Sequence, residues 1–106
     1  MPKYLITASY TAEGAKGVLK EGGTKRRQAA EQAIKSAGGK LEAFYFAFGE
    51  NDAYVVIDAP DHATVVGASV AINASGAVHT KTVVLLTPEE VDQAMKKSVT
   101  YRAPGH

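Results

Sequence analysis

Two strand-like segments in the middle of the chain, residues 41–48 and 53–59, carry large apolar side chains on both of their faces. An antiparallel hairpin that is covered on one side only alternates apolar and polar residues. The doubled pattern therefore predicts that this hairpin is covered on two sides, by helices of its own chain and by something else. The polar turn Gly49-Glu50-Asn51-Asp52 joins the two strands.

Alternation along the two strands assigns their side chains to two faces. One face, which we assign to the helix-covered core, holds the three phenylalanines and the residues opposite them: Phe44, Phe46, Phe48, Ala53, Val55 and Ile57. The other face holds Tyr45, Tyr54, Val56 and Asp58. We expect this tyrosine face to lack cover within the chain. Packing it against the same face of a second copy would remove an apolar patch from water, which predicts a homodimer or a higher homo-oligomer.

Capping residues and periodicity define the elements of the first half of the chain. Residues 3–11 have strand composition, and Thr11 is placed to cap a helix. Paired glycines at Gly22-Gly23 interrupt the helical pattern, so two helical pieces are expected. The second piece begins with Thr24 as N-cap and ends before Gly38-Gly39.

The second half of the chain predicts two helices and one strand. Asp61 caps a helix from His62 to about Ser75, whose apolar residues cover more than one stripe and so predict a buried helix. A strand follows at residues 78–86. Thr87-Pro88-Glu89-Glu90 is a capping box with proline at the first helical position, and it opens a short last helix.

The order of these elements predicts the fold class. Strand, helix, strand, strand, helix and strand, followed by a C-terminal helix, is the α+β ferredoxin-like βαββαβ arrangement, with a four-stranded antiparallel sheet and its helices on one face. A chain of 106 residues is the size of one domain. We place this domain at residues 1–99 and a tail at residues 100–106. The pattern leaves open which face of the first strand points toward the helices.

Composition limits the partners that we expect. Twelve Lys and Arg residues and eleven Asp and Glu residues give a net charge of +1, so no general field favours nucleic acid or an anionic membrane. The absence of cysteine excludes disulfides, thiolate catalysis and zinc sites of the cysteine type. The three histidines lack metal-binding spacing, and we expect neither a metal nor a cofactor. The chain shows neither an export signal nor a transmembrane run, so we expect a cytoplasmic protein.

Several short motifs, spaced along most of the chain, resemble the GYD-domain family. They are Pro2-Lys3-Tyr4, Tyr10-Thr11-Ala12-Glu13-Gly14, Gly38-Gly39-Lys40-Leu41, Phe44-Tyr45, Gly49-Glu50-Asn51-Asp52, Ala59-Pro60-Asp61 and Leu86-Thr87-Pro88-Glu89-Glu90. The resemblance implies a small bacterial protein with a ferredoxin-like fold of the dimeric α/β-barrel type, in a family without an established function. In the family's naming motif a Tyr commonly precedes the Asp. Here Asn51 stands in that place, and Asp52 is kept.

Polar groups on the tyrosine face are the first candidates for a binding site. Tyr45, Tyr54 and Asp58, beside Val56, supply the few polar groups that a small-molecule pocket needs, and a subunit contact rich in tyrosine explains them equally well. His79 shares a strand face with Lys81 and is either a base or ligand in the same cavity or a solvated strand end.

Two further clusters have a structural and a functional interpretation. Gly49-Glu50-Asn51-Asp52 is either a plain turn or a pair of carboxylates presented to a ligand. A basic cluster gathers around the Gly22-Gly23 break, and it is either a solvated helix face or an anion site at a helix N-terminus: Lys20, Lys25, Arg26 and Arg27.

Three functions are compatible with these features. The first is an oligomer that binds a small organic ligand in a cavity between two sheets, lined by Tyr45, Tyr54, Val56, Asp58 and His79. The second, by analogy with dimeric α/β-barrel relatives, is a cofactor-independent monooxygenase or isomerase with His79 or Asp58 as base. The third is a purely structural oligomer.

Overall fold

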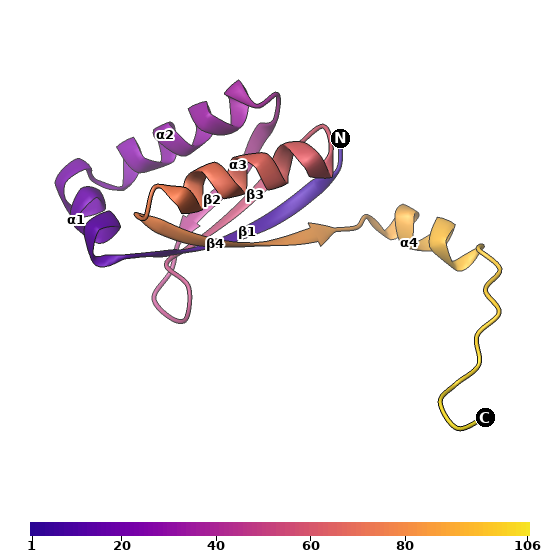
Figure 1. Cartoon of the computed structure of the whole chain (residues 1–106). Coiled ribbons are helices and arrows are strands. Elements are labelled where there is room, and N and C mark those ends of the chain that lie inside the picture. Colours follow the sequence, from indigo (N-terminus) through magenta and orange to yellow (C-terminus); the bar gives the residue numbers. More distant parts are fainter.

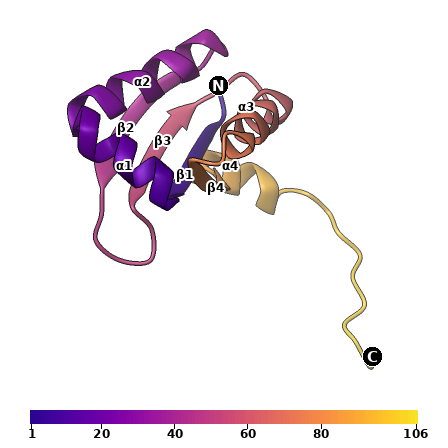
Figure 2. The same ribbon diagram turned by 60° about the vertical axis from the view of Figure 1, so that its left-hand side comes forward.

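A four-stranded antiparallel sheet forms the body of the protein in the computed structural model, which describes residues 1–106 (Figure 1). The elements follow the order β1 (Lys3–Tyr10), α1 (Ala12–Glu21), α2 (Gly23–Ser36), β2 (Lys40–Phe46), β3 (Ala53–Asp58), α3 (His62–Ala74), β4 (Val78–Leu85) and α4 (Pro88–Met95). The strand order is β2-β3-β1-β4, which is the predicted ferredoxin-like arrangement. The first three helices lie on one face of the sheet, and the opposite face is open (Figures 1 and 2).

Local capping explains where most helices begin. The side chains of Thr11, Asp61 and Thr87 each accept a hydrogen bond from a backbone N–H in the first turn of α1, α3 and α4, as the sequence predicts. Thr87 and Glu90 complete the reciprocal capping box. The prediction for Thr24 was wrong. The N-cap of α2 is Gly22, two residues earlier, because Gly22 with φ of 87° turns the chain sharply enough for the new helix to start at Gly23.

The register of the sheet confirms the two predicted faces of the hairpin. Tyr45 lies opposite Tyr54, and Phe44 lies opposite Val55, with a bulge between Leu41 and Ala43. The register also settles the orientation of β1. Its residues Tyr4, Ile6, Ala8 and Tyr10 point toward the helices, while the alternating residues point to the open face.

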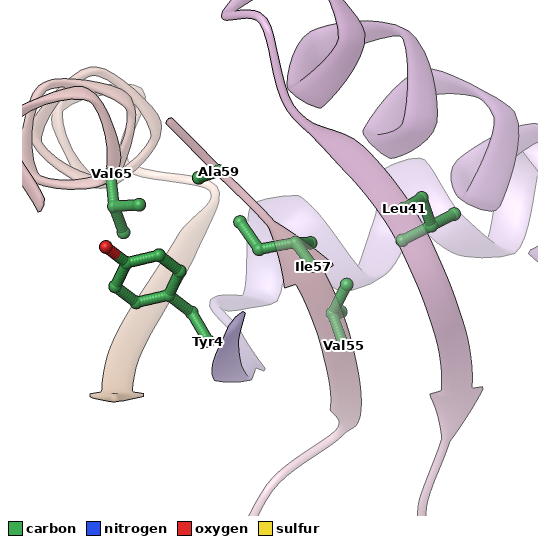
Figure 3. Close-up of a cluster of buried hydrophobic side chains, with 6 residues drawn as sticks. All are labelled: Tyr4, Leu41, Val55, Ile57, Ala59 and Val65. Atoms are coloured by element: carbon green, nitrogen blue, oxygen red, sulfur yellow. The ribbon is translucent and has the colours of Figure 1, made fainter. Parts of the chain in front are cut away.

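The core lies between the sheet and the helices and is small. Ten of the 106 residues are buried, and the main cluster brings Tyr4 from β1 against Val65 of α3 (Figure 3). The other members of this cluster come from β2, β3 and the residue after β3: Leu41, Val55, Ile57 and Ala59. A second cluster of Ala8, Ala53 and Val78 lies toward the other end of the sheet.

Two burial predictions were wrong. Phe44 packs against the core, but Phe46 is 45% exposed and Phe48 is fully exposed, because β2 ends at Phe46 and the chain leaves the sheet before Phe48. Helix α3 was predicted to be buried. It packs over β4 at the edge of the sheet, so its outward residues Val66 and Val70 are 60% and 63% exposed.

The last helix does not pack on the body. After β4 the chain leads α4 and the residues beyond it away from the sheet (Figure 1). The radius of gyration is 16.9 Å, whereas a compact chain of this length has about 13 Å. The exposed residues of this arm include Leu86, Val91, Met95, Val99 and Tyr101.

Candidate functional site

The open face of the sheet carries an unbroken apolar row across all four strands. Cross-strand pairing places Ala43 of β2, Val56 of β3, Leu5 of β1 and Val83 of β4 side by side on this face. No element of the chain covers the row (Figures 1 and 2). Val83 is accordingly 50% exposed.

Tyr45 and Tyr54 form the next row of the same face. They are direct cross-strand partners, and their side chains are 71% and 38% exposed. The Asn51 side-chain N–H donates a hydrogen bond to the Tyr54 hydroxyl (3.3 Å), and the Ser9 hydroxyl donates to the Asn51 side-chain oxygen Oδ1 (3.5 Å). The turn and β1 thus orient one of the two phenols. Val56 of the apolar row lies two residues from Tyr54 and joins the two rows.

Asp58 belongs to an ion-pair network at one end of the open face. The Lys3 ammonium contacts Glu42 (2.8 Å) and Asp58 (2.9 Å). Hydrogen bonds from the ammonium to the Glu42 and Asp58 carboxylates raise the pKa of Lys3 above its ordinary value. Asp58 is therefore already paired with a cation. If it acted as a catalytic base, it would take up a proton, and the loss of its charge would weaken the pair with Lys3.

His79 lies at the other end of the open face, on the edge strand β4. It pairs with Ser9 of β1, whereas Asp58 pairs with Lys3. Lys3 and Ser9 are six residues apart on β1. At about 3.3 Å per residue, Asp58 and His79 are therefore separated by about 20 Å along the strand direction. The structure groups Tyr45, Tyr54 and Val56, and it does not bring Asp58 and His79 to the same place within one chain.

The turn at residues 49–52 is tied to the sheet through Asp52. Its carboxylate accepts a hydrogen bond from the Tyr10 N–H (2.8 Å), and its own N–H donates to the Ala8 carbonyl (2.8 Å). Its carbonyl accepts from the Ala47 N–H (2.9 Å). Glu50 makes no side-chain hydrogen bond or ion pair within the chain and is exposed. Asp52 thus holds β1, the end of β2 and the turn together.

A profile of the GYD domain matches residues 4–95, which is most of the chain and all four strands of the sheet. The chain belongs to the GYD-domain family. No curated protein matches it. Within this GYD domain the contacts of Asp52 are structural, and Asn51 links Ser9 to Tyr54.

The GYD domain contains no group of three or more His, Asp or Glu side chains placed to hold a metal ion. None of its helices has the length and apolar character needed to cross a membrane.

A tyrosine–histidine pair escaped the sequence reasoning. The Tyr4 hydroxyl, at the end of a buried ring, is hydrogen-bonded to Nδ1 of exposed His62, 58 positions away. The two rings meet edge to face. Both residues line an apolar groove between α3 and β4, with Val66, Val70 and Val84. Only the register of β1 could have revealed the pair, because nothing near either residue in the sequence indicates the other.

The basic cluster is dispersed in the structure. Lys20, Lys25 and Arg27 are exposed, whereas the Arg26 side chain turns toward the sheet and lies over the ring of Tyr10, 6.0 Å from its centroid. Of the four, only Arg26 borders the cavity between the helices and the sheet.

Proposed function

We propose that this GYD-domain protein works as a homodimer, or a larger homo-oligomer, in which two open sheet faces pack together and a small organic ligand binds between them. The apolar row of Ala43, Val56, Leu5 and Val83 carries the proposal. It crosses the whole sheet without cover, and covering such a row with the same row of a second copy gives a closed, self-complementary contact.

The total surface of the chain supports assembly. The chain exposes 7692 Å², whereas a compact monomer of 11.1 kDa exposes about 5,700 Å². A typical stable interface buries about 800 Å² on each partner. The excess, which includes the surface of the projecting arm, is larger than the area that one partner buries in such an interface.

We propose the tyrosines as the place where the ligand binds. Tyr45 and Tyr54 stand beside the apolar row, and their hydroxyl groups supply polar contacts next to an apolar wall, which is the usual composition of a small-molecule site. Asp58 and His79 lie at the two ends of the face and would border such a cavity. Nothing in the geometry favours a cofactor-independent monooxygenase or isomerase over binding, because Asp58 already pairs with the Lys3 ammonium and no carboxylate of the chain orients His79. The lack of cysteine is compatible with a cytoplasmic location.

The decisive experiment is native mass spectrometry of gently purified protein, followed by extraction and identification of any bound molecule. Mass is the correct observable, because a compact dimer of this chain would have a radius of gyration of about 17 Å, close to that of the extended single chain. We expect a dimer, or a multiple of it, that carries a stoichiometric small molecule. A monomer would refute the assembly, and a ligand-free oligomer would refute the binding.

A pair of variants assigns the interface to the open face. Val83→Lys places a charge in the apolar row at a position that is already half exposed, and Leu19→Lys makes the same change on α1, at a side chain that is 88% exposed. We expect Val83→Lys to give monomers with unchanged far-ultraviolet circular dichroism and Leu19→Lys to leave the mass unchanged. Equal behaviour of the two variants would contradict the proposed interface.

A further inference from the structure

A cavity of about 580 Å³ lies on the helix-covered side of the sheet, opposite the open face. We call it the helix-side cavity. Residues of β1 and β3, including Ala8 and Val55, form its floor, while α1 and α2 line one side and α3 the other. Figure 2 shows α2 and α3 as separate ribbons on the two sides of this face. Its volume is in the range of small-molecule sites, about 300–1,000 Å³.

Small side chains on the helices keep this space open. Helix α2 turns Ala29, Ala30 and Ala33 toward it, α1 contributes Gly17, and α3 contributes Ala68. Protein interiors are normally packed as densely as organic crystals, so an apolar space of this size is left for an occupant or is lost by collapse. The small residues alone do not show which of these alternatives applies. The side chain of Arg26 favours an occupant.

Arg26 brings an unpartnered donor to the cavity. Its Nε atom is buried and has no hydrogen-bond partner. Both ion pairs of the chain belong to Lys3, so no carboxylate neutralises Arg26. Burying a guanidinium N–H without an acceptor is unfavourable, and buried polar groups in proteins nearly always have a partner. The acceptor for Nε is therefore either a water molecule or a group of a bound ligand.

The surroundings of Arg26 select the charge of that acceptor. Arg26 lies in the first turn of α2, which contains no acidic residue and where the helix dipole favours an anion. The guanidinium also lies over the Tyr10 ring, which stabilises a cation there. However, Glu13 and Glu21 also border the cavity, and both are exposed. Two nearby carboxylates disfavour a multiply charged group such as a phosphate, and a single carboxylate matches the planar guanidinium.

We propose that the helix-side cavity binds a monocarboxylic acid with an apolar body, whose carboxylate pairs with Arg26 and whose apolar part lies along the floor formed by β1 and β3. This site is separate from the one proposed between two sheets, and it requires no second subunit. Its success or failure is therefore independent of the assembly.

The test uses the full-length protein with decanoate as probe and decanol as its uncharged counterpart, measured by isothermal titration calorimetry. We expect one decanoate per chain, bound at least tenfold more tightly than decanol. Arg26→Gln removes the charge and keeps a polar side chain. We expect it to weaken decanoate binding by about 10-fold to 100-fold, the value of one charge-assisted contact, and to leave decanol binding unchanged.

Two matched controls complete the design. Arg27→Gln changes the adjacent exposed arginine, which does not border the cavity, and should bind decanoate as the wild type does. Ala30→Leu fills the cavity and should weaken both probes, whereas Gln28→Leu, on the same helix but outside the cavity, should weaken neither. Circular dichroism reports whether each variant is folded. No binding of decanoate at about millimolar concentration, or equal losses in Arg26→Gln and Arg27→Gln, would overturn the proposal.

Discussion

Asp52 ties the hairpin turn to the sheet through three hydrogen bonds. Its carboxylate and both of its backbone groups hold the turn to β1 and to the end of β2. The carboxylate also fixes the backbone of Tyr10, the residue on which the Arg26 guanidinium rests. Asp52 thus supports Tyr10, which borders the helix-side cavity, and does not line the cavity itself.

We expect Asp52→Ala to lower the free energy of unfolding by about 2 kcal/mol, the usual contribution of a hydrogen bond to a charged group. Urea denaturation measures this loss. Glu50→Ala, in the same turn but without a side-chain partner, is the control and should change stability little. Similar losses in the two variants would show that the turn, and not the Asp52 contact, carries the stability.

Capping residues were predictable because their partners lie within three positions. Thr11, Asp61 and Thr87 were identified from the residue type and the pattern that follows it. The prediction of Thr24 as N-cap was wrong because it, too, used only local residue type. Thr24 has a capping side chain at a suitable place, but the backbone of Gly22 had already started the helix.

At the scale of elements, alternation predicted which residues share a face of the hairpin, and it could not predict how far each strand extends. The pairing of Tyr45 with Tyr54 agrees with the expected faces. The full exposure of Phe48 does not, because the sheet ends before that residue. The breadth of the apolar surface on α3 was recognised, but its cover is not provided by the chain itself.

The beginning of α3 makes the stability of the protein depend on pH. The hydrogen bond from the Thr64 backbone N–H lowers the pKa of Asp61 below its ordinary value of 3.8. Because the folded pKa is the lower one, this contact stabilises the fold fully above the ordinary value. The stabilisation is lost as the pH falls through the folded pKa.

We therefore expect the stability difference between wild type and Asp61→Asn to shrink as the pH is lowered from neutral to below 3.8. Asn keeps a hydrogen-bond acceptor but does not titrate. Urea midpoints at a series of pH values measure the difference. Asp92→Asn, at a carboxylate of α4 without a hydrogen bond in the chain, is the control. A difference that stays constant with pH would contradict this role of Asp61.

At the scale of the whole molecule, α4 is the least explained part of a single chain. An isolated helix of eight residues is marginal in water, and Val91 and Met95 of α4 are 40% and 76% exposed. No element of the chain covers the apolar groove between α3 and β4, and Val66, Val70 and Val84 are exposed along it. In the proposed assembly, the α4 arm of one copy is expected to pack on another copy.

A single charge tests whether α4 takes part in that assembly. We expect Val91→Lys to shift the equilibrium toward smaller species in sedimentation equilibrium, because lysine at an apolar contact must be desolvated. Gln93→Lys introduces the same charge at a polar position of α4 and should have no such effect. If both variants assemble like the wild type, α4 is a free arm and the open sheet face alone holds the copies together.

The sequence by itself determined the order of the elements, most helix starts, the two faces of the hairpin and the family, because each depends on residues that are close together in the chain. Only the tertiary structure decided which residues lie together in each site. The pairings of Tyr4 with His62, Tyr10 with Asp52 and Arg26 with Tyr10 join residues on different elements. Strand register likewise placed Asp58 and His79 at opposite ends of one face. These distances follow from the pairing of strands and the packing of helices over them, which no local pattern encodes.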